Sequence, residues 1–187
     1  MTLALALLGL DCRGLLNSPL VGTGNVDEAA FHARQLSYLR YAAQQGSSRG
    51  SVLNLINHLE RSRVEPRYAP SFVVPVDTYD GIFLKFSRFE NTSDFDLLYL
   101  LNLWLGYGSD PILAAALGAK IESAILGFKY WYTEPTPAGL LDNAYYGSEN
   151  HQIIFHTLEY LAGQSFPDRV FGNDGLTDRE KQAQHAR

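Results

Sequence analysis

A short segment in the last third of the chain carries the residue types best suited to catalysis. Asn150 and His151 follow Ser148, and serine favours the N-cap position of a helix, so we expect the pair in a first helical turn. In that turn the unpaired backbone N–H groups create a positive potential that attracts a carboxylate. The Asn150 amide can donate hydrogen bonds to an anionic ligand, and a neutral His151 can accept a proton. The pair therefore suits removal of a proton next to a carboxylate group.

Aromatic residues gather in the loop before this expected helix. A ring with a polar edge can stack on the face of a sugar, so these residues are candidates for carbohydrate binding. Together with two polar neighbours they form the predicted binding set: Trp131, Tyr132, Tyr145, Tyr146, Glu149 and His156. The alternative interpretation is structural, with the aromatic rings packed in the core and with Asn150 and His151 paired to protein groups.

The same segment raises the question of a metal site, because it contains Glu149, His151, His156 and Glu159. These side chains do not converge on one face of a helix, and the HExxH spacing of zinc enzymes is absent. We therefore predict neither a metal nor another cofactor.

The elements that must position these residues are helices. Periodicity and capping signals predict five of them, over residues 26–45, 51–61, 94–105, 111–131 and 148–162. The signals at their ends are Asn25, Ser51 and Ser148 as N-caps, Pro111 at a first helical position and Gly163 as a C-cap. A capping box at Thr177–Glu180 predicts the start of one more helix.

These helices predict an all-α protein built from antiparallel helical hairpins. An irregular linker rich in aromatic residues and proline is expected over 66–93, and an apolar segment with a loop over 1–24. Helical hairpins without a repeat consensus are typical of an (α/α) toroid. We therefore predict a single domain over 1–187 that forms part of an incomplete toroid, with the chain cut from a longer protein.

Composition and charge narrow the function classes. The chain has 187 residues, of which 46% are hydrophobic, and a net charge of -5, which indicates a globular protein. The sequence lacks the cluster of Lys and Arg that nucleic-acid binding requires. The apolar run over 2–10 is too short to span a bilayer, and it lacks the basic start of a signal peptide. Localisation and oligomeric state therefore stay open.

The Asn150-His151 pair, after a tyrosine-rich loop and before a helix, resembles the Asn-His motif of the (α/α)-toroid polysaccharide lyases, the alginate-lyase and heparinase-like group. The string from Ser148 to Gln164 is also similar to a signature of large uncharacterised bacterial toroid proteins. The lyase resemblance implies β-elimination of a uronate-containing polysaccharide. In it, Asn150 would neutralise the uronate carboxyl group, His151 would remove the C5 proton, and a tyrosine would protonate the leaving oxygen. An acidic polysaccharide is then the expected partner, in the periplasm or outside the cell.

The tyrosine is where the sequence departs from that motif. The lyase tyrosine lies well downstream of the Asn-His pair, whereas this chain has no tyrosine after Tyr160. Tyr145 and Tyr146 are close in sequence and could take that role, although the resemblance supports neither. Two alternatives remain: a six-hairpin glycoside hydrolase with Glu149 or Asp142 as the acid, and a helical binding or scaffold fragment without catalysis.

Overall fold

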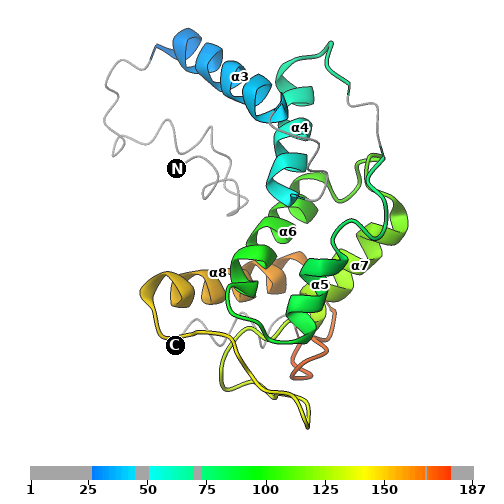
Figure 1. Ribbon diagram of the computed structural model, residues 1–187, viewed down its shortest axis with the longest axis vertical. Coiled ribbons are helices and arrows are strands. Elements are labelled where there is room, and N and C mark those ends of the chain that lie inside the picture. The colour runs from blue at the N-terminus through cyan, green and yellow to red at the C-terminus, as the bar shows by residue number, and fades with distance from the viewer. Residues whose placement is uncertain (1–26, 45–50, 70–72, 167, 178–187) are drawn as a thin grey trace. The chain divides into compact units, whose positions relative to one another are not determined.

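A computed structural model describes residues 27–44, 51–69, 73–166 and 168–177 of the chain (Figure 1). The chain divides into two compact units, the first over Met1–Ser71 and the second over Phe72–Arg187. The described residues form six helices and no strand, which confirms the all-α prediction. None of these helices combines the length and the apolar character needed to cross a membrane. The predicted apolar segment and loop over 1–24 lie outside the described residues.

The described part of the first unit contains a pair of packed helices, α3 (Glu28–Gln44) and α4 (Val52–Val64). The Asp27 side chain accepts a hydrogen bond from the Ala30 N–H group at 3.0 Å, so α3 begins two residues later than predicted; the predicted cap, Asn25, lies outside the described residues. Ser51 accepts the Asn54 N–H group at 3.4 Å, which confirms the predicted cap of α4. Apolar side chains of both helices form the core of this unit: Leu39, Ala42, Val52, Leu55, Ile56 and Leu59.

An ion-pair cluster stabilises the end of α4, which extends three residues beyond its predicted end. The Glu65 carboxylate accepts hydrogen bonds from Arg40 of α3 at 2.6 Å and from Arg61 at 2.7 Å. These bonds, the one from Arg40 first, lower the pKa of Glu65 to about 2. The Arg61 guanidinium also lies 3.9 Å from the centre of the Tyr68 ring. The cluster therefore links both helices to the segment after α4.

Acidification is expected to weaken the first unit between about pH 4.5 and pH 2. The pKa of Glu65 is lower in the folded chain than its ordinary value of 4.5, so its contribution is present above pH 4.5 and is lost as the pH falls toward 2. Amide hydrogen exchange in α4, followed against pH, measures this local loss. Glu65→Gln should remove this part of the pH dependence, whereas Glu60→Gln should keep it. An unchanged acid profile in Glu65→Gln would contradict the assignment.

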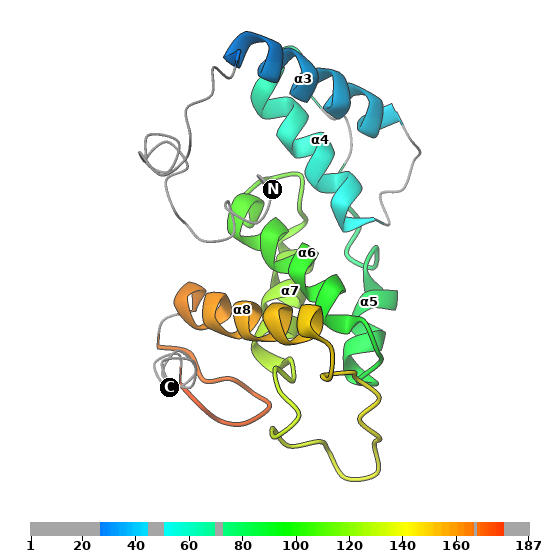
Figure 2. The same ribbon diagram turned by 90° about the vertical axis from the view of Figure 1, so that its left-hand side faces the viewer.

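The described residues of the second unit form four helices: α5 (Asp80–Ser87), α6 (Ser93–Tyr107), α7 (Ala115–Gly127) and α8 (Glu149–Ser165). Helix α6 contacts each of the other three, and α8 crosses it (Figures 1 and 2). Buried side chains from α6, α7 and α8 form most of the core: Leu97, Leu100, Leu101, Leu103, Leu117, Ile121, Ile125, Phe155, Leu158 and Leu161. A helix that is apolar around most of its circumference must be covered on several sides, which explains the central place of α6.

Both ends of the helix predicted over 111–131 are wrong, and a tertiary contact explains the first. The helix expected from Pro111 begins instead at Ala115, because the Ile112 carbonyl accepts the Val74 N–H group at 2.9 Å and Val74 pairs with Leu113 as an isolated parallel bridge. Helix α7 also ends at Gly127 rather than at residue 131. The residues after it are extended or turn and lead into the loop before α8.

Three further predictions need correction or completion. The expected irregular linker over 66–93 contains helix α5, although three prolines occur in the linker before this helix. Gly163 is not a C-cap, because α8 continues to Ser165 and Gly163 is buried inside it. Thr177 pairs with Val170 in an isolated antiparallel bridge, and the rest of the predicted capping box lies outside the described residues.

Candidate functional site

The start of α8 displays Asn150 at the surface. Ser148 occupies the N-cap position with an extended backbone, as predicted. Its hydroxyl donates to the Asn150 side-chain oxygen at 2.6 Å instead of accepting a backbone N–H group. Asn150 is exposed, and its side-chain nitrogen makes no hydrogen bond with any described residue. The amide nitrogen is therefore available to an incoming acceptor at the positive end of a helix.

His151 lies next to Asn150 in sequence but is buried, and it pairs with an acid from another helix. Its Nδ1 atom lies 2.7 Å from Oδ2 of Asp94, the second residue of α6. The Asp94 side chain is 1% exposed and that of His151 is 9% exposed, so water screens this contact little. Burial raises the pKa of the Asp94 carboxyl, and the hydrogen bond with His151 opposes that rise.

Three aromatic rings surround the His151 imidazole. Phe95 and Tyr145 meet it edge-on, with ring centres 5.2 and 5.6 Å away, and Phe155 stacks near it at 6.4 Å. Tyr145 is 53% exposed. A Cβ atom at Gly147 would lie 3.0 Å from the Tyr145 hydroxyl, so the glycine leaves room for that ring beside the start of α8.

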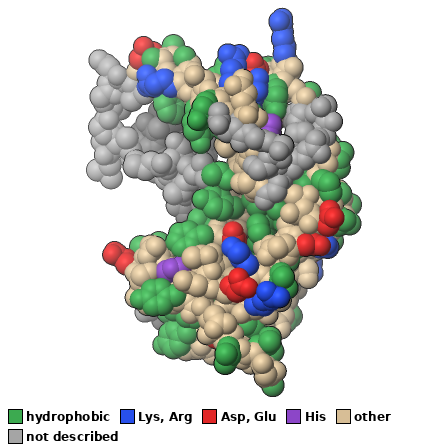
Figure 3. Space-filling view, in the orientation of Figure 1, with side chains coloured by type: hydrophobic (Ala, Val, Ile, Leu, Met, Phe, Trp, Pro, Cys, Tyr) green, Lys and Arg blue, Asp and Glu red, His purple; other side chains and the backbone are tan. Residues whose placement is uncertain are grey.

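The other predicted aromatic residues divide between packing and exposure. Trp131 packs on His156 with ring centres 4.3 Å apart, and Tyr146 packs on Phe155 at 4.7 Å, so both cover the side of α8. Tyr132 is 60% exposed. Figure 3 shows that hydrophobic, acidic, basic and histidine side chains are intermixed on the face that it draws.

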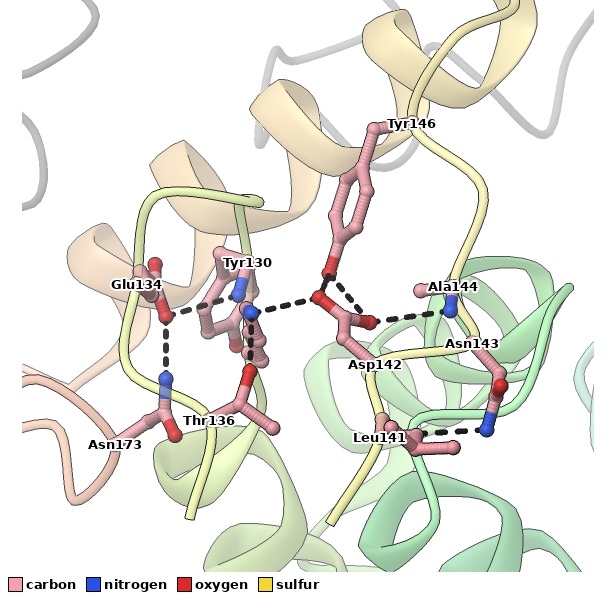
Figure 4. A network of polar contacts seen from close by, with 10 residues as sticks. Tyr130, Glu134, Thr136, Leu141, Asp142, Asn143, Ala144, Tyr146 and Asn173 are labelled. Carbon is pink, nitrogen blue, oxygen red and sulfur yellow. Dashed lines mark hydrogen bonds and ion pairs between the residues drawn. The ribbon is translucent and has the colours of Figure 1, made fainter. Parts of the chain in front are cut away.

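A polar network fixes the loop that carries these rings. The Lys129 ammonium, with its side chain 4% exposed, donates to Asp142 at 2.6 Å and to Thr136 at 2.7 Å. The Tyr146 hydroxyl donates to Asp142 at 3.3 Å, and burial followed by this carboxylate raises the pKa of Tyr146 (Figure 4). The Asp142 carboxylate also accepts the Ala144 N–H group at 3.1 Å. The tyrosine-rich part of the loop is thus held to residues that directly follow α7.

Two further contacts anchor the same loop. The Asn143 N–H group donates to the Phe89 carbonyl at 3.0 Å, which connects the loop to the turn between α5 and α6. The Glu134 carboxylate accepts the Tyr130 N–H group at 3.1 Å and the Asn173 amide at 2.8 Å (Figure 4). The loop before α8 therefore has several fixed points along its length.

The structure brings together part of the predicted site. The Tyr145 and His151 rings meet at the start of α8, and Glu149 and Asn150 are exposed directly before His151 in the same helix. His156 packs against Trp131 further along the helix. Sequence reasoning missed Asp94, because it lies 57 residues before His151 and no local spacing predicts contacts over such a separation.

Neither a metal centre nor a relative supplies an identity. Among the described residues, no group of three or more His, Cys, Asp or Glu side chains is placed to hold a metal ion. Comparisons of the chain with protein-family models, with curated proteins and with solved structures found no match. The function must therefore be argued from the geometry of the site.

Proposed function

We propose that the start of α8 is the proton-abstraction site of a polysaccharide lyase-like protein that cleaves a uronate-containing polysaccharide by β-elimination, with the helices forming part of an (α/α) toroid. One observation carries this proposal. The exposed Asn150 amide, which has no acceptor among the described residues, lies next to a His151 whose Nδ1 atom is bonded to Asp94, at the positive end of a helix.

These residues would have two roles in the reaction, binding of the uronate carboxylate and removal of the C5 proton. Asn150 and the first N–H groups of α8 would bind the uronate carboxylate, which stabilises the negative charge that develops when C5 loses its proton. His151, through its Nε2 atom, would take that proton. The electron pair of the C5–H bond then forms the C4–C5 double bond, and the C4–O bond breaks with its electrons on the leaving oxygen.

The leaving oxygen also needs a proton, and Tyr145 suits this role better than Tyr146. Tyr145 is exposed and meets the His151 ring edge-on. The Tyr146 hydroxyl already donates to the Asp142 carboxylate. Burial and this carboxylate raise the pKa of Tyr146, so the hydroxyl gives up its proton less readily. Tyr132 is exposed as well and offers a surface for stacking a sugar ring.

The two alternatives receive less support from these contacts. Asp142 is a poor candidate for the acid because its carboxylate already accepts hydrogen bonds from Lys129 and from the Ala144 N–H group within the loop. A scaffold role explains the buried pair of His151 and Asp94 equally well, but it does not explain why the Asn150 amide is exposed at the start of α8. The scaffold is therefore the second candidate.

The test uses the purified full chain and a panel of uronate polysaccharides. Elimination creates an unsaturated uronate whose ultraviolet absorbance is followed directly. We expect Asn150→Ala to lower the rate by about 100- to 1,000-fold, as removal of one charge-stabilising donor does. Gln152→Ala, at an exposed position two residues later, should leave it unchanged. In parallel, NMR of the Asn150 side-chain amide during titration with an oligouronate tests binding. If neither new absorbance nor a shift of this resonance is observed, the proposal is rejected and the scaffold is favoured.

A further inference from the structure

We propose that Asp94 is a positioning residue for His151, which holds the imidazole with its proton on Nδ1 and so keeps Nε2 as the proton acceptor. The catalytic consequence rests on the proposed function, whereas the choice of tautomer does not. None of the sequence motifs points to Asp94, and its role follows from the contact between α6 and α8.

The contact has the geometry of a strong, directed hydrogen bond. An ionised carboxylate can only accept, so the Nδ1 atom at 2.7 Å from Asp94 Oδ2 must be the donor when Asp94 is charged. The other Asp94 oxygen, Oδ1, is buried and has no hydrogen bond with the described residues. Loss of the bond to His151 would therefore leave a buried carboxylate without a side-chain partner.

The surrounding rings hold the imidazole in this orientation. Phe95 and Tyr145 contact it edge-on, and Phe155 lies nearly parallel to it, with 30° between the ring planes. A half-turn of the imidazole would exchange Nδ1 with a carbon atom and replace the Asp94 bond with an apolar contact. Packing and hydrogen bonding thus favour the same orientation.

The negative charge of Asp94 also affects the electrostatic potential at His151. The positive end of α8 disfavours a positive charge on His151, yet a base that takes a proton becomes an imidazolium. The negative Asp94 side chain, in direct contact and screened little by water, offsets that potential and stabilises the protonated ring. Asp94 is therefore placed to stabilise the positive charge that develops on the His151 ring during proton transfer.

The first test reads the tautomer without any substrate. Nitrogen-15 NMR of the full chain with labelled histidine distinguishes a protonated ring nitrogen from an unprotonated one. In the unaltered chain at neutral pH we expect His151 to carry its proton on Nδ1. Asp94→Asn should shift the population toward Nε2–H, because an amide can donate to Nδ1. Asp96→Asn, two residues along α6 in a more exposed ion pair with Lys85, should leave it unchanged.

The second test measures the catalytic effect. Asp94→Asn should lower kcat by about 100- to 10,000-fold, the range of general-base catalysis, with little change in KM. Asp94→Glu, which retains the charge, should recover part of kcat and the Nδ1–H tautomer. If Asp94→Asn does not fold, the nitrogen-15 spectrum of Asp94→Glu tests the tautomer instead, and an Nε2–H tautomer in it would contradict the proposal. A predominant Nε2–H tautomer in the unaltered chain, or an unchanged tautomer in folded Asp94→Asn, would overturn the proposal. Absence of elimination alongside the expected tautomers would reject the lyase function but not the positioning by Asp94.

Discussion

Replacing His151 with alanine is expected to destabilise the second unit by about 3–5 kcal/mol near neutral pH. The substitution removes the side-chain partner of Asp94 and leaves a carboxylate that is 1% exposed, which is among the costliest changes in a protein interior. Urea unfolding followed by tryptophan fluorescence measures the effect in the correct unit, because both tryptophans, Trp104 and Trp131, belong to the second unit.

Two controls separate this buried pair from an ordinary loss of contacts. The double variant Asp94→Ala/His151→Ala should cost less than the sum of the two single variants, because no unpaired charge remains. Removal of the more exposed ion pair through Lys85→Ala should cost no more than about 1 kcal/mol. A loss below 1 kcal/mol for His151→Ala would contradict the assigned importance of the pair.

The stability of the His151→Ala variant should depend on pH in a defined direction. Burial already raises the pKa of Asp94, and removal of His151 takes away the hydrogen bond that opposes this rise. The folded variant then binds a proton more tightly than its unfolded chain, so its stability falls as the pH rises above the ordinary carboxyl range. The loss in free energy of unfolding that His151→Ala causes should consequently be smaller at pH 4 than at pH 7.

Replacing Phe155 with alanine is expected to cost a comparable amount, about 3–5 kcal/mol, through lost burial and the cavity that remains. Phe155 is 1% exposed and contacts the rings of Phe128, Trp131, Tyr146 and His151. Because this side chain joins the aromatic loop to α8, its removal should also let water reach Trp131 and shift the fluorescence emission to longer wavelength.

Ile153 provides the matched control for this prediction. It lies on the same helix but is 59% exposed, so Ile153→Ala should change the stability by no more than about 0.5 kcal/mol. The tryptophan emission of that variant should match the unaltered chain. Equal losses for Phe155→Ala and Ile153→Ala would show that Phe155 does not hold the loop on α8.

Capping and periodicity predicted the helices whose signals are local. Ser51 caps α4 as expected, and Ser148 directly precedes α8, although its hydroxyl bonds Asn150 rather than the backbone. The prediction failed at Pro111, where a hydrogen bond from Val74 to Ile112 outweighs the helix-start preference of proline. It failed again at α5, because prolines and short extended runs concealed an eight-residue helix that packs against α6.

Sequence alone therefore determined that this chain is helical and that Asn150 and His151 meet at a helix start, because both facts depend on residues within one or two turns of each other. Only the tertiary structure decided that Asn150 is exposed, that His151 is buried against Asp94, and that Tyr145 rather than Tyr146 has an exposed ring beside them. These outcomes depend on how α6, α8 and the intervening loop pack. The physical reason is that burial and electrostatic pairing arise between segments distant along the chain, whereas helix formation is governed by near neighbours.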